Sequence, residues 1–271
     1  MKSIISTTYD DKYLYFLPIV TWLWSKLGVD VVCFLPNIEG RSVNTSVKLL
    51  LATEFATEQY TKTNLHLHYF DAPEHKQATY AQCSRLYGAC LDLPIDEVLI
   101  TSDIDMAVFQ TPNHGSSFTV NGIDLVPKGQ VPICYISGEV KEWRRKFAVA
   151  GRSYQQCLDD LLGDIECDNM RGNYWAKDQE EAYNKILGRP ESHAVLLPRS
   201  NGQNQFATRR YDRDDSFILD RLNPDTIDYH MNRPGYEDDN FEIILQILSY
   251  HYPAEDFTWL INYTNEYKKL L

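Results

Sequence analysis

Short apolar runs alternate with amphipathic stretches over the first hundred residues of the chain. Apolar or β-branched side chains dominate four segments, which predict strands at residues 3–9, 29–35, 65–70 and 97–102. Apolar positions at helical spacing lie between them and predict helices at residues 11–27, 46–56 and 76–91. Because strands and helices alternate, the pattern is typical of an α/β fold with a mostly parallel, Rossmann-like sheet flanked by helices.

The first helix has recognisable boundaries. Asp10 is suited to cap its start, and Gly28 is suited to end it. Pro18 lies inside the segment and lacks a backbone N–H, so we expect it to kink or delay the helix.

After Phe109 the pattern becomes less regular, because glycines and prolines interrupt short apolar runs. This irregularity predicts a smaller mixed sheet with loops. Helical spacing returns at residues 153–162, 178–187 and 238–250. The chain contains no internal repeat, low-complexity tract or linker, so we expect a single domain over residues 1–271.

The charge of the chain limits its partners. The 271 residues carry a formal net charge of −12, and the hydrophobic content of 44% is ordinary for a globular protein. An acidic surface repels phosphate backbones, which argues against nucleic acid as a bulk partner. A nucleotide diphosphate can still bind where a metal ion or a few arginines offset the charge locally.

Cysteine usage and hydropathy indicate the compartment. The six cysteines form no CxxC pair, and we expect buried free thiols at Cys33, Cys83, Cys90, Cys134, Cys157 and Cys167. No apolar run approaches the ~20 residues of a membrane span, and no signal peptide precedes the first strand. We therefore expect a cytoplasmic protein without a membrane span; the sequence gives no indication of its oligomeric state.

The chemistry is concentrated in residues 99–106, where an apolar strand runs into Asp103-Ile104-Asp105. In extended backbone the side chains of residues i and i+2 point to the same side, so the two carboxylates converge. Two convergent carboxylates suit a divalent cation that keeps open positions for substrate phosphates. At the carboxyl end of a central parallel strand, this is where α/β sheets bind ligands.

Several blocks resemble a known family. Tyr80-Ala81-Gln82-Cys83-Ser84-Arg85-Leu86, Leu93-Pro94, Val98-Leu99-Ile100 and Asp103-Ile104-Asp105 follow one another in the order seen in nucleotide-sugar transferases of the GT-A fold. The order is most similar to that of glycosyltransferase family 8. Two later blocks, residues 175–180 and 229–235, resemble the Asp-Gln and histidine segments of that family. The resemblance implies transfer of a sugar from a nucleotide-sugar donor, namely a UDP-sugar, to a glycan acceptor.

The resemblance also implies a division of labour. It assigns residues 1–109 to the nucleotide-sugar-binding half and residues 110–271 to the acceptor side, with the smaller sheet. It places a Mn²⁺ ion, or Mg²⁺ in its stead, on Asp103, Asp105 and His230. It also implies that Asp178 and Gln179 line the anomeric side of the donor sugar as catalytic residues. The donor contacts that it implies are Thr7, Thr8, Tyr9, Arg85 and Asp103.

The chain departs from the family pattern at two places. Thr101-Ser102 precedes the acidic motif where the family has Tyr-Leu, and Asn232-Arg233-Pro234-Gly235 stands for its Gly-x-Lys-Pro-Trp. Structural interpretations are also open: His230 as a structural histidine, Asp178 as a helix cap, and Arg85 as an exposed or salt-bridged helix residue. The run at residues 209–213 is interpreted either as a diphosphate site or as a solvated charge run.

Two other functions fit parts of the sequence. A haloacid-dehalogenase-like phosphatase also places Asp-x-Asp after a strand, and residues 163–168 imitate its later acidic motif. Ala107 and the helical pattern before residue 163 count against it. A non-catalytic nucleotide-sugar-binding protein on the same fold is the other alternative.

Overall fold

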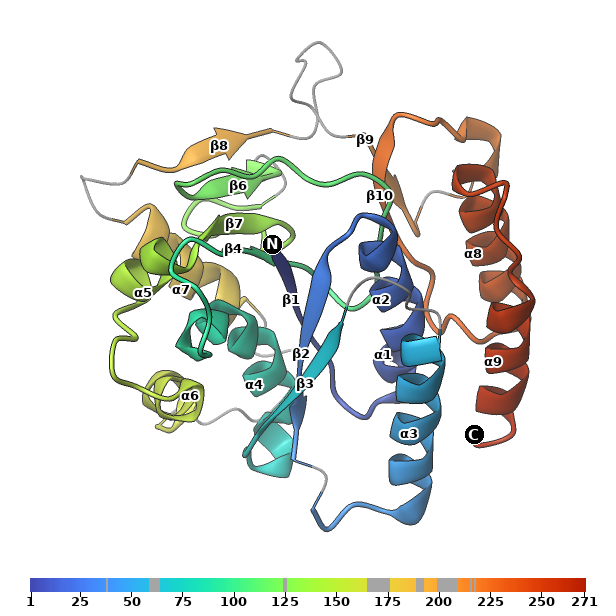
Figure 1. Ribbon diagram of the computed structural model, residues 1–271, viewed down its shortest axis with the longest axis horizontal. Helices are drawn as coiled ribbons and strands as arrows, with labels where there is room; N and C mark the ends of the chain where they lie inside the picture. The colour runs from blue at the N-terminus through green and yellow to red at the C-terminus, as the bar shows by residue number, and fades with distance from the viewer. Residues whose placement is uncertain are drawn as a thin grey trace.

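The computed structural model describes residues 1–37, 39–58, 64–123, 126–164, 176–188, 193–198, 209–214, 216 and 218–271. Within these ranges the strands form a seven-stranded and a three-stranded sheet. Figure 1 shows α1, α2, α3, α8 and α9 on one side of the large sheet, and α4, α5, α6 and α7 on the other. This arrangement confirms the predicted α/β class.

The first four strands of the large sheet are parallel and lie in the order β3-β2-β1-β4. Their bounds are β1 Lys2–Ser6, β2 Asp30–Pro36, β3 Leu65–Phe70 and β4 Val98–Thr101. Antiparallel pairing of β7 with β4 and of β6 with β7 makes the sheet mixed beyond β4. These outer strands are β6 Thr119–Asn121, β7 Ile136–Glu139 and β8 Val195–Leu197.

The helices on the two faces follow the predicted spacing in most places. Pro18 stands in the first turn of α2, so residues 11–27 form two helices, α1 Asp11–Leu14 and α2 Leu17–Lys26. Asp10 caps α1, as predicted, by accepting a hydrogen bond of 2.9 Å from the Lys12 amide. The others are α3 Val43–Glu58, α4 Gln77–Ser84, α5 Val140–Phe147, α6 Tyr154–Leu162, α7 Lys177–Ile186, α8 Asp238–His251 and α9 Thr258–Lys268, with 3₁₀ segments η1 Glu74–Lys76, η2 Arg85–Cys90 and η4 Ile218–Arg221. None of the described helices is long and apolar enough to cross a membrane.

Burial on both faces holds the large sheet in place. Ile5 of β1 packs into the cluster beneath α2, α8 and α9, while its neighbour Ile4 packs into the cluster beneath α4, α5 and α6. Both side chains are fully buried, which contributes about 1.5–3 kcal/mol each. A strand that is anchored from both sides positions its carboxyl end firmly, and that end borders the candidate site.

The small sheet joins segments that lie far apart in the sequence. Its order is β5-β10-β9, with β5 at Met106–Val108, β9 at Arg209–Asp212 and β10 at Thr226–His230. β10 is antiparallel to β5 and parallel to β9. β5 begins directly after the acidic motif, so this sheet brings the last third of the chain to that motif. The predicted second, smaller sheet of mixed pairing is confirmed.

Candidate active site

A cavity of about 410 Å³ opens at the carboxyl ends of the neighbouring strands β1 and β4. Because both strands are parallel, the loops that follow them meet at one edge of the sheet. The cavity is lined by most of the residues singled out in the sequence: Thr7, Thr8, Arg85, Asp103, Asp105, Asp178, Gln179 and His230. The fold therefore gathers these side chains from five separate segments.

Tyr9 is the exception among the predicted residues, because it is absent from the described lining of this cavity. Its hydroxyl donates a hydrogen bond of 2.6 Å to the Pro36 carbonyl. The Arg41 guanidinium lies 5.0 Å above its ring. Tyr9 therefore links the ends of β1 and β2, and its contact with a nucleoside stays a prediction.

Asp105 is the most heavily contacted carboxylate of the cavity. Its Oδ2 atom lies 2.9 Å from Nη1 of Arg213 and 3.1 Å from Nε2 of His230. The Nε atom of Arg233 is 3.3 Å from the same oxygen. Burial by itself would raise the pKa of Asp105, but these three partners outweigh it and hold the pKa well below its usual range.

The register of the small sheet explains this cluster. His230 of β10 pairs with Met106 of β5, so its ring lies beside Asp105, the residue before Met106. Asp212 of β9 pairs with His230 from the other side, and Arg213 follows it directly. The Met231 amide also donates a 2.9 Å hydrogen bond to the Asp105 carbonyl. The ring of His230 thus lies at the cavity, beside Asp105.

Arg85 connects the other two carboxylates. It is buried, and its guanidinium forms ion pairs with Asp103 and, at 2.8 Å, with Asp178. Hydrogen bonds from its N–H groups to the Gln82 and Ser102 carbonyls, at 3.1 and 3.2 Å, fix its orientation. Of the two structural alternatives for Arg85, an exposed side chain is wrong and a salt-bridged one is confirmed.

The two carboxylates respond differently to this shared partner. Burial pushes the pKa of Asp103 upward, but the Arg85 guanidinium prevails and the pKa is lowered. For Asp178 burial prevails over Arg85 and raises the pKa from 3.8 to about 6. Carboxyl groups with separated pKa values in one cavity are typical of sites where the two groups take different roles.

The capping interpretation of Asp178 is also wrong. Helix α7 begins at Lys177, and its capping position is occupied by Ala176. Asp178 lies within the first turn, where its Oδ1 accepts a 2.8 Å hydrogen bond from the Gln179 amide. Its other oxygen turns toward Arg85, so the side chain bonds one first-turn amide and also faces the cavity.

The charge of the cavity differs from that of the whole chain. Among its described lining residues are four carboxylates and four guanidiniums: Asp10, Asp103, Asp105, Asp178, Arg85, Arg210, Arg213 and Arg233. A cavity with balanced charge accepts an anion far more readily than a surface with a net charge of −12 does. Arg210 and Arg213 are only one-fifth exposed, so the interpretation of their run as solvated charges is wrong for these two side chains.

The predicted metal ligands are only partly assembled. Asp105 and His230 touch, and a carboxylate with an imidazole suits Mn²⁺ or Mg²⁺ with phosphate oxygens as further ligands. The Asp103 carboxylate lines the same cavity but is paired with Arg85. Over the described part of the chain, no three His, Cys, Asp or Glu side chains form a complete cluster. The donor set fits a cation at Asp105 and His230 that substrate oxygens complete.

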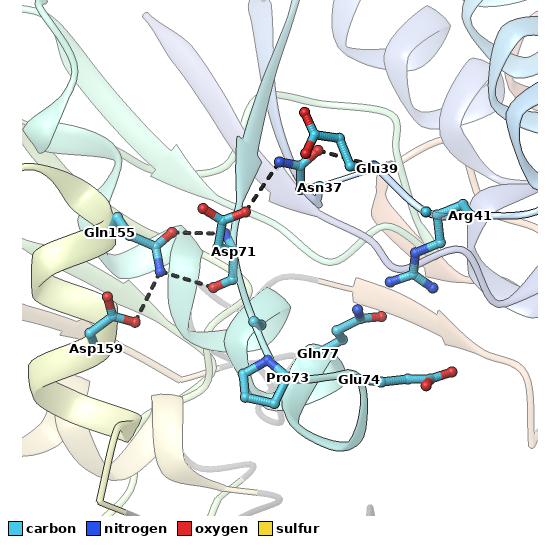
Figure 2. A pocket seen from close by; sticks show the side chains of 11 residues that line it. Asn37, Glu39, Arg41, Asp71, Pro73, Glu74, Gln77, Gln155 and Asp159 are labelled. Carbon is cyan, nitrogen blue, oxygen red and sulfur yellow. Dashed lines mark hydrogen bonds between the residues drawn. The ribbon is translucent and has the colours of Figure 1, made fainter.

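A second cavity of about 650 Å³ lies at the carboxyl ends of β2 and β3 (Figure 2). Hydrogen bonds link the Asn37 amide to Asp71 at 3.2 Å and the Gln155 amide to Asp159 at 2.9 Å. Among the described residues that line it are four carboxylates but one guanidinium, that of Arg41. This charge disfavours a diphosphate, so the smaller cavity is the better candidate although it encloses less space.

Three side chains that line the candidate site received no individual role from the sequence. Arg213 was noted only within the run at residues 209–213, as a diphosphate site or a solvated charge run, and Arg233 only as a departure from the family pattern. Tyr13 of α1 was not noted; it lies beneath the Arg233 guanidinium at 4.9 Å and accepts a hydrogen bond from it. The side chain of Arg209, Trp175 of the Asp-Gln block, Cys167 and residues 165–168 lie outside the described part of the chain.

Comparison with known proteins identifies the fold. The chain is similar over its whole length to the galactosyltransferase LgtC, which was crystallised in complex with donor and acceptor sugar analogues. The TM-score is 0.53 at 10% sequence identity, and the match covers 100% of both chains. The glycosyltransferase GlyE of Streptococcus pneumoniae TIGR4 gives a TM-score of 0.45 at 13% identity and covers 99% of this chain and 64% of its own. No family model and no curated protein matches the sequence. The chain thus has the GT-A glycosyltransferase fold, and membership of family 8 stays a prediction.

Proposed function

We propose that this protein is a glycosyltransferase that moves a sugar from a nucleotide-diphosphate sugar, namely a UDP-sugar, to a glycan acceptor with the help of Mn²⁺ or Mg²⁺. One observation carries the proposal. On a glycosyltransferase fold, the cavity at the ends of β1 and β4 brings Asp105 and His230 into contact and places the Arg85–Asp178 pair beside them. The fold likeness gives no support to the phosphatase alternative.

The proposed role of each residue follows from its position in the cavity. Thr7 and Thr8 follow β1 and line the cavity. They would contact the nucleoside. Asp105 and His230 would hold the cation, with Asp103 near the ribose and the cation. A cation at this place would stabilise the diphosphate leaving group, a contribution on the order of several kcal/mol.

Arg85, Asp178 and Gln179 would act on the sugar. Arg85 is buried and fixed by four hydrogen bonds, so it keeps Asp178 and Asp103 at a constant spacing. Cleavage of a sugar–phosphate bond develops positive charge on the sugar ring. A buried carboxylate and an amide on the anomeric side can stabilise that charge and position the acceptor hydroxyl.

The test is a binding and turnover experiment. A panel of nucleotide sugars is screened by thermal shift with Mn²⁺, Mg²⁺ or EDTA, because a ligand that binds the folded state raises the melting temperature. The donor found in this way is then incubated with a panel of glycans, and transfer is followed by mass spectrometry. Binding with hydrolysis or transfer supports the proposal. Binding without either identifies a nucleotide-sugar-binding protein, and the absence of binding to every donor contradicts the proposed site.

A further inference from the structure

Three groups share one carboxylate oxygen in the candidate site: Arg213, His230 and Arg233 all lie within 3.3 Å of Oδ2 of Asp105. A divalent cation bound to this oxygen takes up its lone pairs at short distance and repels a neighbouring guanidinium. The side chains around Asp105 therefore cannot have the same arrangement with and without a bound cation. At least one guanidinium has to leave Asp105 when a cation binds.

Two of the arginines at the cavity are held by other contacts. Arg85 donates hydrogen bonds to two carbonyls as well as to its two carboxylate partners. Arg233 stacks on Tyr13 with its guanidinium carbon 4.9 Å from the ring centre, and it donates a hydrogen bond to the Tyr13 hydroxyl. Both side chains therefore have partners other than Asp105.

Arg213 differs from both. Over the described part of the chain, its guanidinium has Asp105 as its hydrogen-bonding partner, at 2.9 Å, and it follows directly on the end of β9. Its side chain is one-fifth exposed and lines the cavity. The planar guanidinium offers several N–H donors in a fork that suits phosphate oxygens.

We propose that Arg213 is an exchangeable counter-ion: it neutralises Asp105 while the site lacks a cation, and it binds the donor diphosphate once a cation occupies Asp105. The inference rests on the proposed function, since it requires a nucleoside diphosphate in this cavity. It assigns two opposite effects to one side chain. Arg213 competes with the cation when no nucleotide is present and strengthens nucleotide binding when the cation is bound.

This double role has a signature in binding experiments. Isothermal titration calorimetry measures the affinity for Mn²⁺ alone and then the affinity for UDP at saturating Mn²⁺. Arg213→Ala removes the competitor and should bind Mn²⁺ alone about 10-fold more tightly, while UDP binds about 10- to 100-fold more weakly. Arg213→Lys keeps the charge but loses the fork, so its affinity for Mn²⁺ should stay at the parent value while UDP is weakened.

Arg145→Ala is the matched control. This arginine is 62% exposed on α5 and pairs with Glu142, so its removal changes the net charge equally but should leave both affinities at parent values. The exchange alone is overturned if the parent protein binds both ligands but Arg213→Ala has an unchanged affinity for Mn²⁺. It is also overturned if Arg213→Ala loses affinity for Mn²⁺ and for UDP together. Parent protein that binds neither Mn²⁺ nor UDP overturns the proposed function and the exchange with it. Arg213→Lys keeps the test valid if the alanine variant does not fold.

Discussion

The imidazole Nε2 of His230 lies 3.1 Å from Oδ2 of Asp105, although 125 positions separate the two residues. The contact follows from strand register, because His230 pairs with Met106 across β5 and β10. A slip of one residue in this pairing would turn the ring to the opposite face of the sheet. The small sheet thus brings His230 to Asp105. Both residues are therefore suitable for mutation.

Asp105→Asn should abolish most of the transfer activity. The change keeps the volume of the side chain but removes the carboxylate that would hold the cation, so turnover should fall at least ~100-fold. It also leaves the Arg213 and Arg233 guanidiniums without their shared counter-ion. Steady-state transfer assays measure the loss, and a parallel denaturation curve checks the fold. Asp238→Asn serves as control, because this carboxylate is 91% exposed; near-normal transfer by the Asp105 variant would contradict the cation assignment.

His230→Ala should weaken the interaction with the cation while leaving a working site. Loss of one ligand from a small set lowers metal affinity by roughly 10- to 100-fold. Activity of the variant should therefore rise with added Mn²⁺ toward the parent level. Titration of activity with Mn²⁺ for both proteins distinguishes the two interpretations: a packing histidine would give a lower melting temperature and superimposable Mn²⁺ curves.

Asp178→Asn should change how stability depends on pH. The pKa of Asp178 is raised to about 6 from an ordinary value of 3.8. A carboxyl group with a raised pKa favours folding while it is protonated, and this contribution is lost as pH rises through the folded-state pKa. Between pH 5 and pH 8 the parent should lose about 1–2 kcal/mol that the neutral asparagine variant keeps.

Chemical denaturation at pH 5 and pH 8 measures this difference. At pH 8 the free energy of unfolding of the variant should rise relative to that of the parent. The variant should lose transfer activity at both pH values, because a buried charge that costs stability is retained for its chemistry. If the difference in unfolding free energy between the two proteins is the same at both pH values, Asp178 titrates normally and the argument from burial is wrong.

Gly235→Ala should loosen the segment that follows the candidate site. A Cβ atom at this position would lie 2.6 Å from Cε1 of Phe16 and 2.8 Å from Cε1 of Tyr15. Both rings are buried, so relief of the overlap requires the backbone to move, at a cost of about 1–3 kcal/mol. Thermal unfolding measures the loss, and weaker UDP binding should accompany it because Arg233 is two residues away. Gly115→Ala is the control, since its nearest contact would be at 3.8 Å; equal effects of the two changes would contradict the steric argument.

The pattern of apolar residues was sufficient for the strands of the first hundred residues. The predicted strand at 65–70 coincides with β3. Its ends are clear in the sequence, because polar residues flank the segment on both sides. The predicted strand at 3–9 ends earlier, at Ser6, since Thr7 and Thr8 leave the sheet to line the cavity. Helix α9 was not predicted: its buried positions are Leu260, Tyr263, Thr264 and Tyr267, and tyrosine and threonine give little hydrophobic signal.

The sequence by itself determined that Asp103 and Asp105 follow a buried strand, and both line the cavity. The extended backbone expected to make them converge is absent, because the strand ends at Thr101 and residues 104 and 105 form a turn. Tertiary structure decided which groups surround them. Arg213 and His230 reach Asp105 only through the pairing of β9, β10 and β5, and Arg85 reaches Asp178 only through the packing of α4 against α7. The charge on each carboxylate depends on these distant partners and on burial, and neither quantity is encoded in the spacing of residues along the chain.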